Sequence, residues 1–350
     1  MDSRFLDLGT CVCRLSASEE IQDAMRHYVS PFLVSAGIHE PPHLTVSVER
    51  DAATVAQVRQ SLADLPPTTV RTSHPEQRYR IWIIEDREIL LPEHAADHVI
   101  IRTPGLVAVA AERACVAATI GIRVVRQLVM RGGEVRGGRC VHAAAVDIDG
   151  RGLLIAGHPG SGKTTALTHL IEDHGARPVS NDRTALIPTD TARWHAIGVP
   201  LAARFTPEGI GGSPTLTAAL NHFEPSRGRH LVDGKIELTP WELATLFNRS
   251  TAPVTEVAHL VILTRSAQVS VGERDGDFVQ HHLDFGTEDF FADDWLNLRS
   301  HLSEALPEAQ SAGDDLWERL AETVSVLPLA WTDPAELPRI AATAYRRVQT

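Results

Sequence analysis

Short runs of apolar and β-branched residues mark the first part of the chain. Such runs are typical of strands, and Pro-rich turns such as residues 64–69 separate them. A longer segment, from about Ala108 to Met130, has the length and composition of a helix, and Gly132–Gly133 provides its stop signal. The predicted strands are 43–50, 79–86 and 97–103.

The second part of the chain combines apolar runs with turn and helix signals. Two apolar runs flank Asp149–Gly150, a dipeptide typical of a β-hairpin. The second run leads into a glycine-rich loop, after which a helix is predicted from Lys163 to about His174. Further strands are predicted at 176–180, 184–188 and 257–265, and further helices at about 290–306 and 334–348.

These patterns predict two domains. The Gly/Arg-rich stretch at 131–140 is typical of a connection, and 350 residues are enough for two domains. We expect a smaller α+β domain over residues 1–135 and a mixed α/β domain over residues 136–350.

Composition narrows the possible partners and the compartment. A formal net charge of -12 disfavours a general binder of nucleic acid or anionic membranes. The longest apolar run is interrupted by charges at Glu112, Arg113 and Arg123, so no membrane span is expected. The first ten residues do not have the pattern of a signal peptide, and the four cysteines have no zinc-site spacing. We therefore expect a cytoplasmic protein with reduced thiols.

The motif with the clearest chemistry is a phosphate-binding loop. Residues 157–164, GHPGSGKT, match G-x-x-x-x-G-K-[ST] at every fixed position, between a predicted strand and a predicted helix. Glycines let successive N–H groups surround phosphate oxygens, and the helix N-terminus adds partial positive charge. The expected ligands are ATP and Mg²⁺, and the nucleotide-binding residues are Gly157, Pro159, Gly160, Ser161, Gly162, Lys163, Thr164 and Thr165.

Lys163 is one of only two lysines in a chain that otherwise uses arginine. Arginine cannot replace lysine where a compact point charge on a thin stem is required, so this lysine is expected to serve the chemistry. Lys163 should contact the β- and γ-phosphates, and the Thr164 hydroxyl should bind Mg²⁺. His158, inside the loop, is expected to face solvent.

The segment "VHAAAVDIDGRGLLIAGHPGSGKTTALTHLIEDHGARPVSNDR" resembles the catalytic core of the HPr kinase/phosphorylase family. That family belongs with the phosphoenolpyruvate-carboxykinase-like nucleotide-binding folds. It typically has a histidine fifteen residues before the loop and an acidic pair about seventeen residues after the loop lysine. Here His142 precedes Gly157 by fifteen residues, and Asn181 follows Lys163 by eighteen. The resemblance covers about residues 140–185.

The resemblance implies roles for three further residues. His142 matches the histidine beside the acceptor and the transferred phosphate, and Asp182 matches the second acid, a metal contact beside Thr164. Asn181 stands where the family has its first aspartate, the presumed general base, and an amide cannot accept a proton at neutral pH. Deprotonation therefore falls to His142 or Asp182, unless the acceptor needs little help from a base. The family's Gly-rich signature segment is not recognisable, so HPr as acceptor and reversible phosphorolysis are not expected.

Other candidates stay open. Lys235 could contact phosphate or the acceptor, or be an exposed hairpin residue, and Arg204 could supply a transition-state cation. A metal site from His281, His282 and Asp284 is conceivable, although a solvated loop and helix start is the preferred interpretation.

The function expected from the sequence is an Mg²⁺–ATP-dependent kinase that phosphorylates a hydroxyl on a small molecule, peptide or protein. The N-terminal domain would select the acceptor or regulate the reaction, and a homo-oligomer is left open. The main alternative is an NTPase that switches with its nucleotide and has no acceptor. A carboxykinase-type lyase and a scaffold without catalysis are further alternatives.

Overall fold

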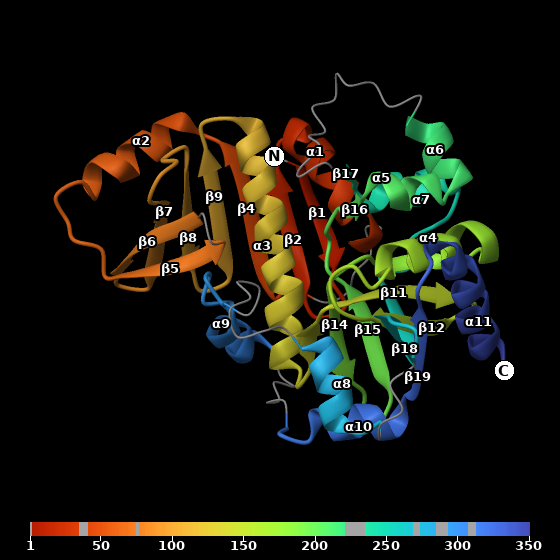
Figure 1. Cartoon of the computed structure of the whole chain (residues 1–350). Helices are drawn as coiled ribbons and strands as arrows, with labels where there is room; N and C mark the ends of the chain where they lie inside the picture. The colour runs from red at the N-terminus through yellow and green to blue at the C-terminus, as the bar shows by residue number, and fades with distance from the viewer. Residues whose placement is uncertain are drawn as a thin grey trace. The chain divides into compact units, whose positions relative to one another are not determined.

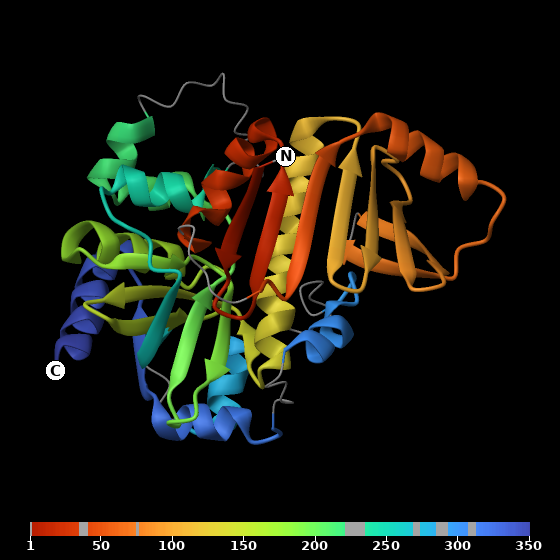
Figure 2. The same cartoon turned by 180° about the vertical axis from the view of Figure 1, so that it is seen from behind.

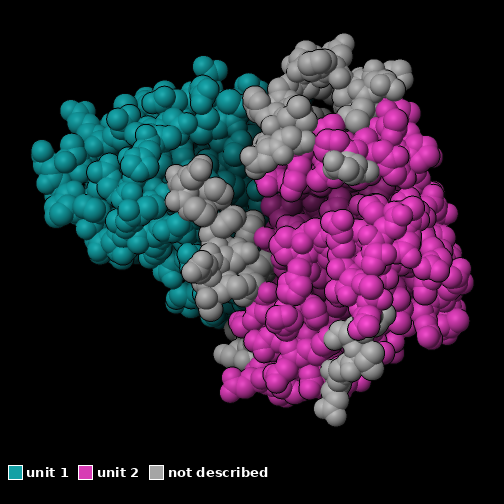
Figure 3. All heavy atoms as spheres, in the orientation of Figure 1, with its two compact units in different colours: residues 1–136, 285–310 teal, residues 137–284, 311–350 magenta. Residues whose placement is uncertain are grey.

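The computed structural model describes residues 2–34, 41–74, 77–220, 235–268, 274–284, 293–306 and 313–350. The chain is a mixed α/β protein with large sheets, and it divides into two compact units (Figure 3). Unit 1 comprises residues 1–136 and 285–310, and unit 2 comprises residues 137–284 and 311–350. Residues 285–310, which the sequence analysis placed with the second domain, thus belong to the first unit.

Unit 1 is built on a nine-stranded sheet of order β3-β1-β2-β4-β9-β8-β7-β6-β5 (Figure 1). Its elements are β1 (Asp2–Asp7), β2 (Val12–Ala17), α1 (Glu19–Val29), η1 (Ser30–Phe32), β3 (Leu33–Val34), β4 (Leu44–Arg50), α2 (Ala52–Ser61), β5 (Thr69–His74), β6 (Gln77–Ile84), β7 (Arg87–Pro92), β8 (His98–Thr103), β9 (Leu106–Ala111), α3 (Ala114–Val135) and α9 (Leu298–Ala305). The β2–β4 and β4–β9 pairs are parallel, and the other pairs are antiparallel.

Helix α3 runs along one face of this sheet (Figures 1 and 2). Strands β4 and β9 bury alternate residues, as expected where one face of a sheet is packed more tightly than the other. Gly121 of α3 lies against Val48 of β4 and Met25 of α1, so the helix packs directly on the sheet and its neighbouring helix.

One sequence prediction in unit 1 is corrected. The segment from Ala108 to Met130 is not one helix, because residues 106–111 form β9, and α3 begins only at Ala114. Strand β9 forms between β4 and β8, partners that a helical pattern does not reveal. Gly132–Gly133 do not stop the helix, which continues to Val135. A Cβ on Gly132 would lie 2.7 Å from Thr10 Oγ1, so this glycine permits close packing.

Unit 2 is built on an eight-stranded sheet in which β10-β14-β15-β18-β12-β11-β13 are neighbours and β19 pairs with β18. Its main elements are β10 (Arg139–Val141), β11 (Ala143–Ile148), β12 (Arg151–Ala156), α4 (Lys163–His174), β13 (Arg177–Ser180), β14 (Thr184–Pro188), β15 (Trp194–Gly198), β18 (Val254–Arg265), α8 (Gly276–Leu283), α10 (Leu316–Thr323), β19 (Ser325–Trp331), η4 (Pro334–Glu336) and α11 (Leu337–Gln349). Shorter elements are β16 (Ala203–Phe205), α5 (Pro207–Gly211), α6 (Pro214–Leu220), β17 (Ile236–Leu238) and α7 (Pro240–Leu246).

Both faces of the unit 2 sheet are buried. Neighbouring residues of β12 alternate between two cores, with Leu153 and Ile155 in one and Leu154 and Ala156 in the other. Helices α4, α7 and α11 contribute to the first core, and α8 and α10 contribute to the second. A strand buried on both faces has a nearly continuous apolar sequence, as β12 and β18 have.

Most sequence predictions for unit 2 agree with these elements. Asp149 and Gly150 have φ of 53° and 88°, as a type I′ hairpin turn between β11 and β12 requires. The predicted helix at 290–306 falls in unit 1 and is only partly confirmed: α9 begins at Leu298, the described residues 293–297 are not helical, and residues 290–292 lie outside the described residues. Within the part of the chain that the structure describes, no helix is long and apolar enough to cross a membrane.

Candidate functional site

The phosphate-loop motif lies between β12 and α4 in unit 2. Gly157, Gly160 and Gly162 have φ of 144°, 80° and 91°, values that residues other than glycine rarely adopt. A Cβ on Gly157 would collide with the Leu263 carbonyl oxygen and the Ser161 hydroxyl. The glycines are therefore required by backbone conformation and, at Gly157, by close packing.

Lys163 lies at the start of α4 and is 8% exposed. Its Nζ donates to the Gly157 carbonyl oxygen at 2.6 Å and to the His158 carbonyl oxygen at 3.4 Å. Burial lowers the pKa of Lys163, Asp182 opposes this shift, and Arg183 adds to it. The ammonium is thus held within the curve of the loop by neutral carbonyl groups, which an anionic ligand can replace.

Ser161 is held by its backbone and has an unsatisfied hydroxyl. Trp331 Nε1 donates to its carbonyl oxygen at 2.7 Å, which ties the loop to the end of β19. Ser161 Oγ is buried and has no hydrogen-bond partner among the described residues. A buried hydroxyl without a partner costs stability and is a common sign of a site for a polar ligand. No signal in the sequence pointed to Trp331.

The sheet brings His142 and Asp182 together. His142 lies between β10 and β11, and these strands pair with β14 and β13 respectively. Residues 181–183 connect β13 to β14, so this turn has to lie beside the break at His142. His142 Nε2 is 3.0 Å from Asp182 Oδ1. Strand pairing of Ala143 with Ala156 also places His142 next to the first glycine of the loop.

Asp182 is bound on both carboxylate oxygens. Arg183 NH1 donates to its Oδ2 at 2.6 Å, while His142 is bonded to its Oδ1. Burial raises the pKa of Asp182, but the hydrogen bond from His142 and the charges of Arg183, His142 and Lys163 outweigh it, so the net pKa is lowered. Asp182 is therefore an ionised carboxylate and a weak base. Arg183 is a residue that sequence reasoning missed.

The remaining candidates of the loop and turn occupy distinct positions. Asn181 is buried next to Asp182, at 8% exposure. Thr164 and Thr165 lie half-buried in the first turn of α4, and Pro159 and Gly160 are exposed at the tip of the loop.

Two further candidates lie on the small β16–β17 sheet. Arg204 Nε donates to Glu237 Oε1 at 2.7 Å across this sheet, and Lys235 is exposed beside it. Among the described contacts, none connects either residue to the His142–Asp182 pair.

The structure groups the histidines differently from the sequence prediction. His281 and His282 lie near His158 of the phosphate loop, whereas Asp284 pairs with Arg139 at 3.8 Å. His158 is exposed as expected, but its ring also contacts the other two rings. The loop position of His158 gave no signal of this partnership, because it depends on where α8 ends.

Comparison with known proteins finds a likeness among solved structures. No protein-family model matches the chain, and no curated protein does. Among solved structures, the chain is similar to the Hpr(Ser) kinase/phosphatase from Coxiella burnetii, with 14% identity over 60% of this chain and 90% of that chain. The TM-score is 0.33, so the two backbones coincide only in part, and the likeness assigns neither a reaction nor a substrate to this chain.

Proposed function

We propose that the chain is an Mg²⁺–ATP-dependent kinase that transfers the γ-phosphate to a hydroxyl of a small molecule, peptide or protein. The observation that carries this proposal is the 3.0 Å contact of His142 with Asp182, beside a complete phosphate-loop motif. A nucleotide-binding loop alone would fit a switch equally well. The pair adds a proton acceptor and a carboxylate where a phosphorylated hydroxyl would have to lie.

The residues present fit a nucleoside triphosphate. The loop offers a backbone concavity with three left-handed glycines, a buried ammonium on neutral carbonyls and a buried hydroxyl without a described partner. Such a set of donors suits phosphate oxygens. Bound Mg²⁺–ATP would supply the phosphoryl group, with Thr164 and Asp182 as the oxygen donors for the metal.

The His142–Asp182 pair would manage the acceptor's proton. Asn181 cannot act as a base, and the lowered pKa of Asp182 makes its carboxylate a poor one. Asp182 instead holds the His142 ring in one orientation through their 3.0 Å contact, as a carboxylate does for a catalytic histidine. His142 then takes the proton from the acceptor hydroxyl. Lys163 and the loop N–H groups position the phosphates, which carries most of the rate in phosphoryl transfer.

The test is incubation of the full chain with γ-labelled ATP and a panel of free amino acids, sugars, nucleosides and small proteins. We expect label to appear on one hydroxyl-bearing class, and both Lys163→Met and His142→Asn to abolish the labelling. Lys235→Met, which replaces the other lysine, is the matched control and should label normally. Labelling of no acceptor by a chain that still binds ATP would reject the kinase.

The alternative is a nucleotide-dependent switch without an acceptor, and Asn181 favours it. A buried amide in place of a catalytic acid is compatible with slow hydrolysis and with orientation of a water molecule. The two functions differ in how ATP turnover responds to hydroxyl compounds. Turnover by a kinase rises when its acceptor is added, while turnover by a switch is unchanged.

A further inference from the structure

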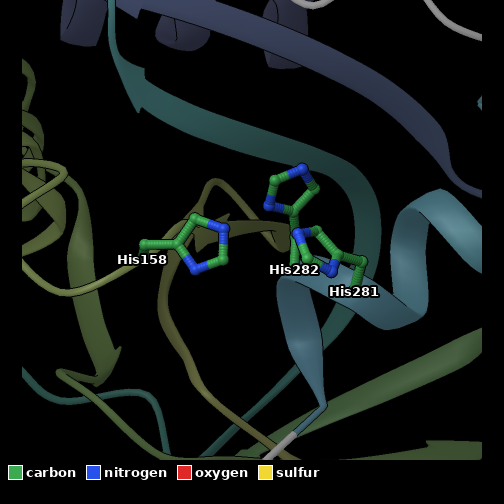
Figure 4. Close-up of side chains that lie close together, drawn as sticks. All are labelled: His158, His281 and His282. Atoms are coloured by element: carbon green, nitrogen blue, oxygen red, sulfur yellow. The ribbon is translucent and has the colours of Figure 1, made fainter.

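Three histidines converge at the mouth of the phosphate loop. His158 belongs to the loop itself, and His281 and His282 occupy the last turn of α8. One ligand atom from each ring can be chosen so that all lie within 4.8 Å of one another. Figure 4 shows the His158 ring on one side and the other two rings facing it, with a nitrogen of each directed toward the space between them.

The end of α8 is anchored beside the loop. The His142 backbone N–H donates to the Leu283 carbonyl oxygen at 2.8 Å, directly after the histidine pair. Val279 and Leu283 are buried in the same core as Ala156, the last residue of β12 before the loop. The convergence of the rings therefore follows from core packing and a backbone hydrogen bond, although the segments are more than 120 residues apart in the chain.

Among the described contacts, the three rings of the cluster have no carboxylate partner, unlike two other histidines of unit 2. His142 and His169 each have a carboxylate partner, Asp182 and Asp173. The described residues provide no hydrogen bond to the rings of the cluster, and His282 Nδ1 is buried without a partner. The rings meet edge-on or tilted, with centroids 5.0–5.3 Å apart, so they are not stacked face to face.

The rings are better suited to a metal cation than to an anion. A neutral imidazole offers a lone pair, the form that binds metals. Imidazole nitrogen suits zinc, copper, nickel and cobalt, whereas Mg²⁺ prefers oxygen ligands. The cluster is thus chemically distinct from the oxygen donors Thr164 and Asp182.

We propose that His158, His281 and His282 bind one divalent transition-metal ion of the zinc type, with at least one coordination position left open. Nitrogens bound to tetrahedral zinc lie about 3.4 Å apart, from Zn–N distances of about 2.0–2.1 Å. The present separation requires closure by about 1.5 Å, and the exposed His158 and His281 side chains allow it. The metal would link the phosphate loop to the end of α8. This site does not depend on the proposed kinase reaction.

The test is metal binding by the full chain, purified free of metal. Co²⁺ is titrated first, visible absorption reports nitrogen coordination, and Zn²⁺ is then added to displace it. We expect one equivalent of Co²⁺ to bind, and His158→Gln and His281→Gln each to weaken binding at least about tenfold. His195→Gln is the matched control, because His195 is an exposed histidine of β15 away from the cluster, and it should bind as the wild type does.

Any of three results would contradict the proposed metal site. These are failure of the wild type to bind one equivalent, unchanged affinity in the His158→Gln, His281→Gln double variant, or an equal loss in His195→Gln. Circular dichroism checks that the variants are folded, which substitution of two exposed side chains should permit. Lys163→Met separates this proposal from the kinase, since it should lose nucleotide chemistry and retain metal binding.

Discussion

The two sheets of this protein bury their strands differently. In unit 1, β4 and β9 bury every second residue, whereas in unit 2 all six residues of β11 are buried and only the first residue of β12 is exposed. Unit 1 has a sheet that is packed most tightly on one face. Unit 2 has a sheet between two helical layers, so its polar chemistry has to gather at the ends of the strands, where the phosphate loop and the Asn181–Arg183 turn lie.

A carboxylate in each unit shows what this difference means. Glu88 of unit 1 is bound by Arg71, Arg102 and Asn297, and its side chain is only 7% exposed. Asp182 of unit 2 is bound by His142 and Arg183, yet its side chain is 42% exposed. Both are ionised and paired. Glu88 is enclosed and stabilises the fold, while Asp182 is accessible and can serve a ligand.

The largest expected effect is on Lys163. Lys163→Met should reduce ATP turnover by about 1000-fold or more, because a preorganised cation is removed from the charge that develops on the phosphates. Turnover is measured by phosphate release or by acceptor labelling. Lys235→Met is the control and should change turnover less than twofold. Equal losses in both variants would break the assignment of the site to the loop.

The next effect is on the stability of unit 1. Glu88→Gln should lower the free energy of unfolding by about 3 kcal/mol, because it leaves two guanidinium groups near a neutral amide in a buried place. Urea denaturation measures this loss. Asp23→Asn removes an exposed partner of Arg26 and should cost less than about 1 kcal/mol. Similar losses in the two variants would show that the enclosure of Glu88 contributes nothing.

The contribution of Glu88 should also depend on pH. Burial raises the pKa of Glu88, but the hydrogen bonds from Arg71, Arg102 and Asn297 lower it by more than burial raises it. The native pKa therefore lies below the usual value. The stabilisation is therefore complete above the unfolded pKa of about 4.3 and is lost as the pH falls through the native pKa. The difference in stability between wild type and Glu88→Gln should shrink below about pH 4. A difference that grows on acidification would contradict the sign of the shift.

Substitution of Asp182 should affect turnover more than stability, the reverse of what is expected for Glu88. Asp182→Asn should reduce turnover by about 10–100-fold, since His142 loses the carboxylate that orients it. Its unfolding free energy should change less than that of Glu88→Gln, because a more exposed charge is screened by water. Parallel measurements of turnover and urea unfolding on both variants decide this. A pure stability defect in Asp182→Asn would remove the distinction between the two carboxylates.

The smallest effect concerns two glycines of α3. Gly132→Ala should destabilise by about 1–3 kcal/mol, because its Cβ would meet the branched Thr10 side chain at 2.7 Å. Gly121→Ala meets Val48 and the flexible Met25 side chain at 3.0–3.1 Å. There, the helix propensity of alanine, about 1 kcal/mol better than glycine, should offset much of the cost. Equal losses in urea unfolding would mean that the neighbours of these glycines do not decide the outcome.

Local sequence was sufficient for the features that depend on neighbouring residues. The Asp149–Gly150 hairpin, the glycine loop and the helix from Lys163 to His174 were predicted with the bounds that the structure has. Each depends on backbone conformations that only a few residue types adopt, and these residues lie next to one another in the chain. The spacing of His142 from the loop was also readable, because a hairpin places paired residues side by side.

Tertiary structure decided the features that depend on partners distant in the chain. Residues 106–111 became a strand because β4 and β8 lie on either side, and Gly132 is tolerated in a helix because Thr10 packs against it. The grouping of His158 with His281 follows from the anchoring of α8. Residues 285–310 belong to unit 1, although residues 137–284 of unit 2 separate them from the rest of unit 1 in the chain. A pattern of apolar residues records that a position is buried, but not which other segment buries it, because hydrophobic burial has no direction.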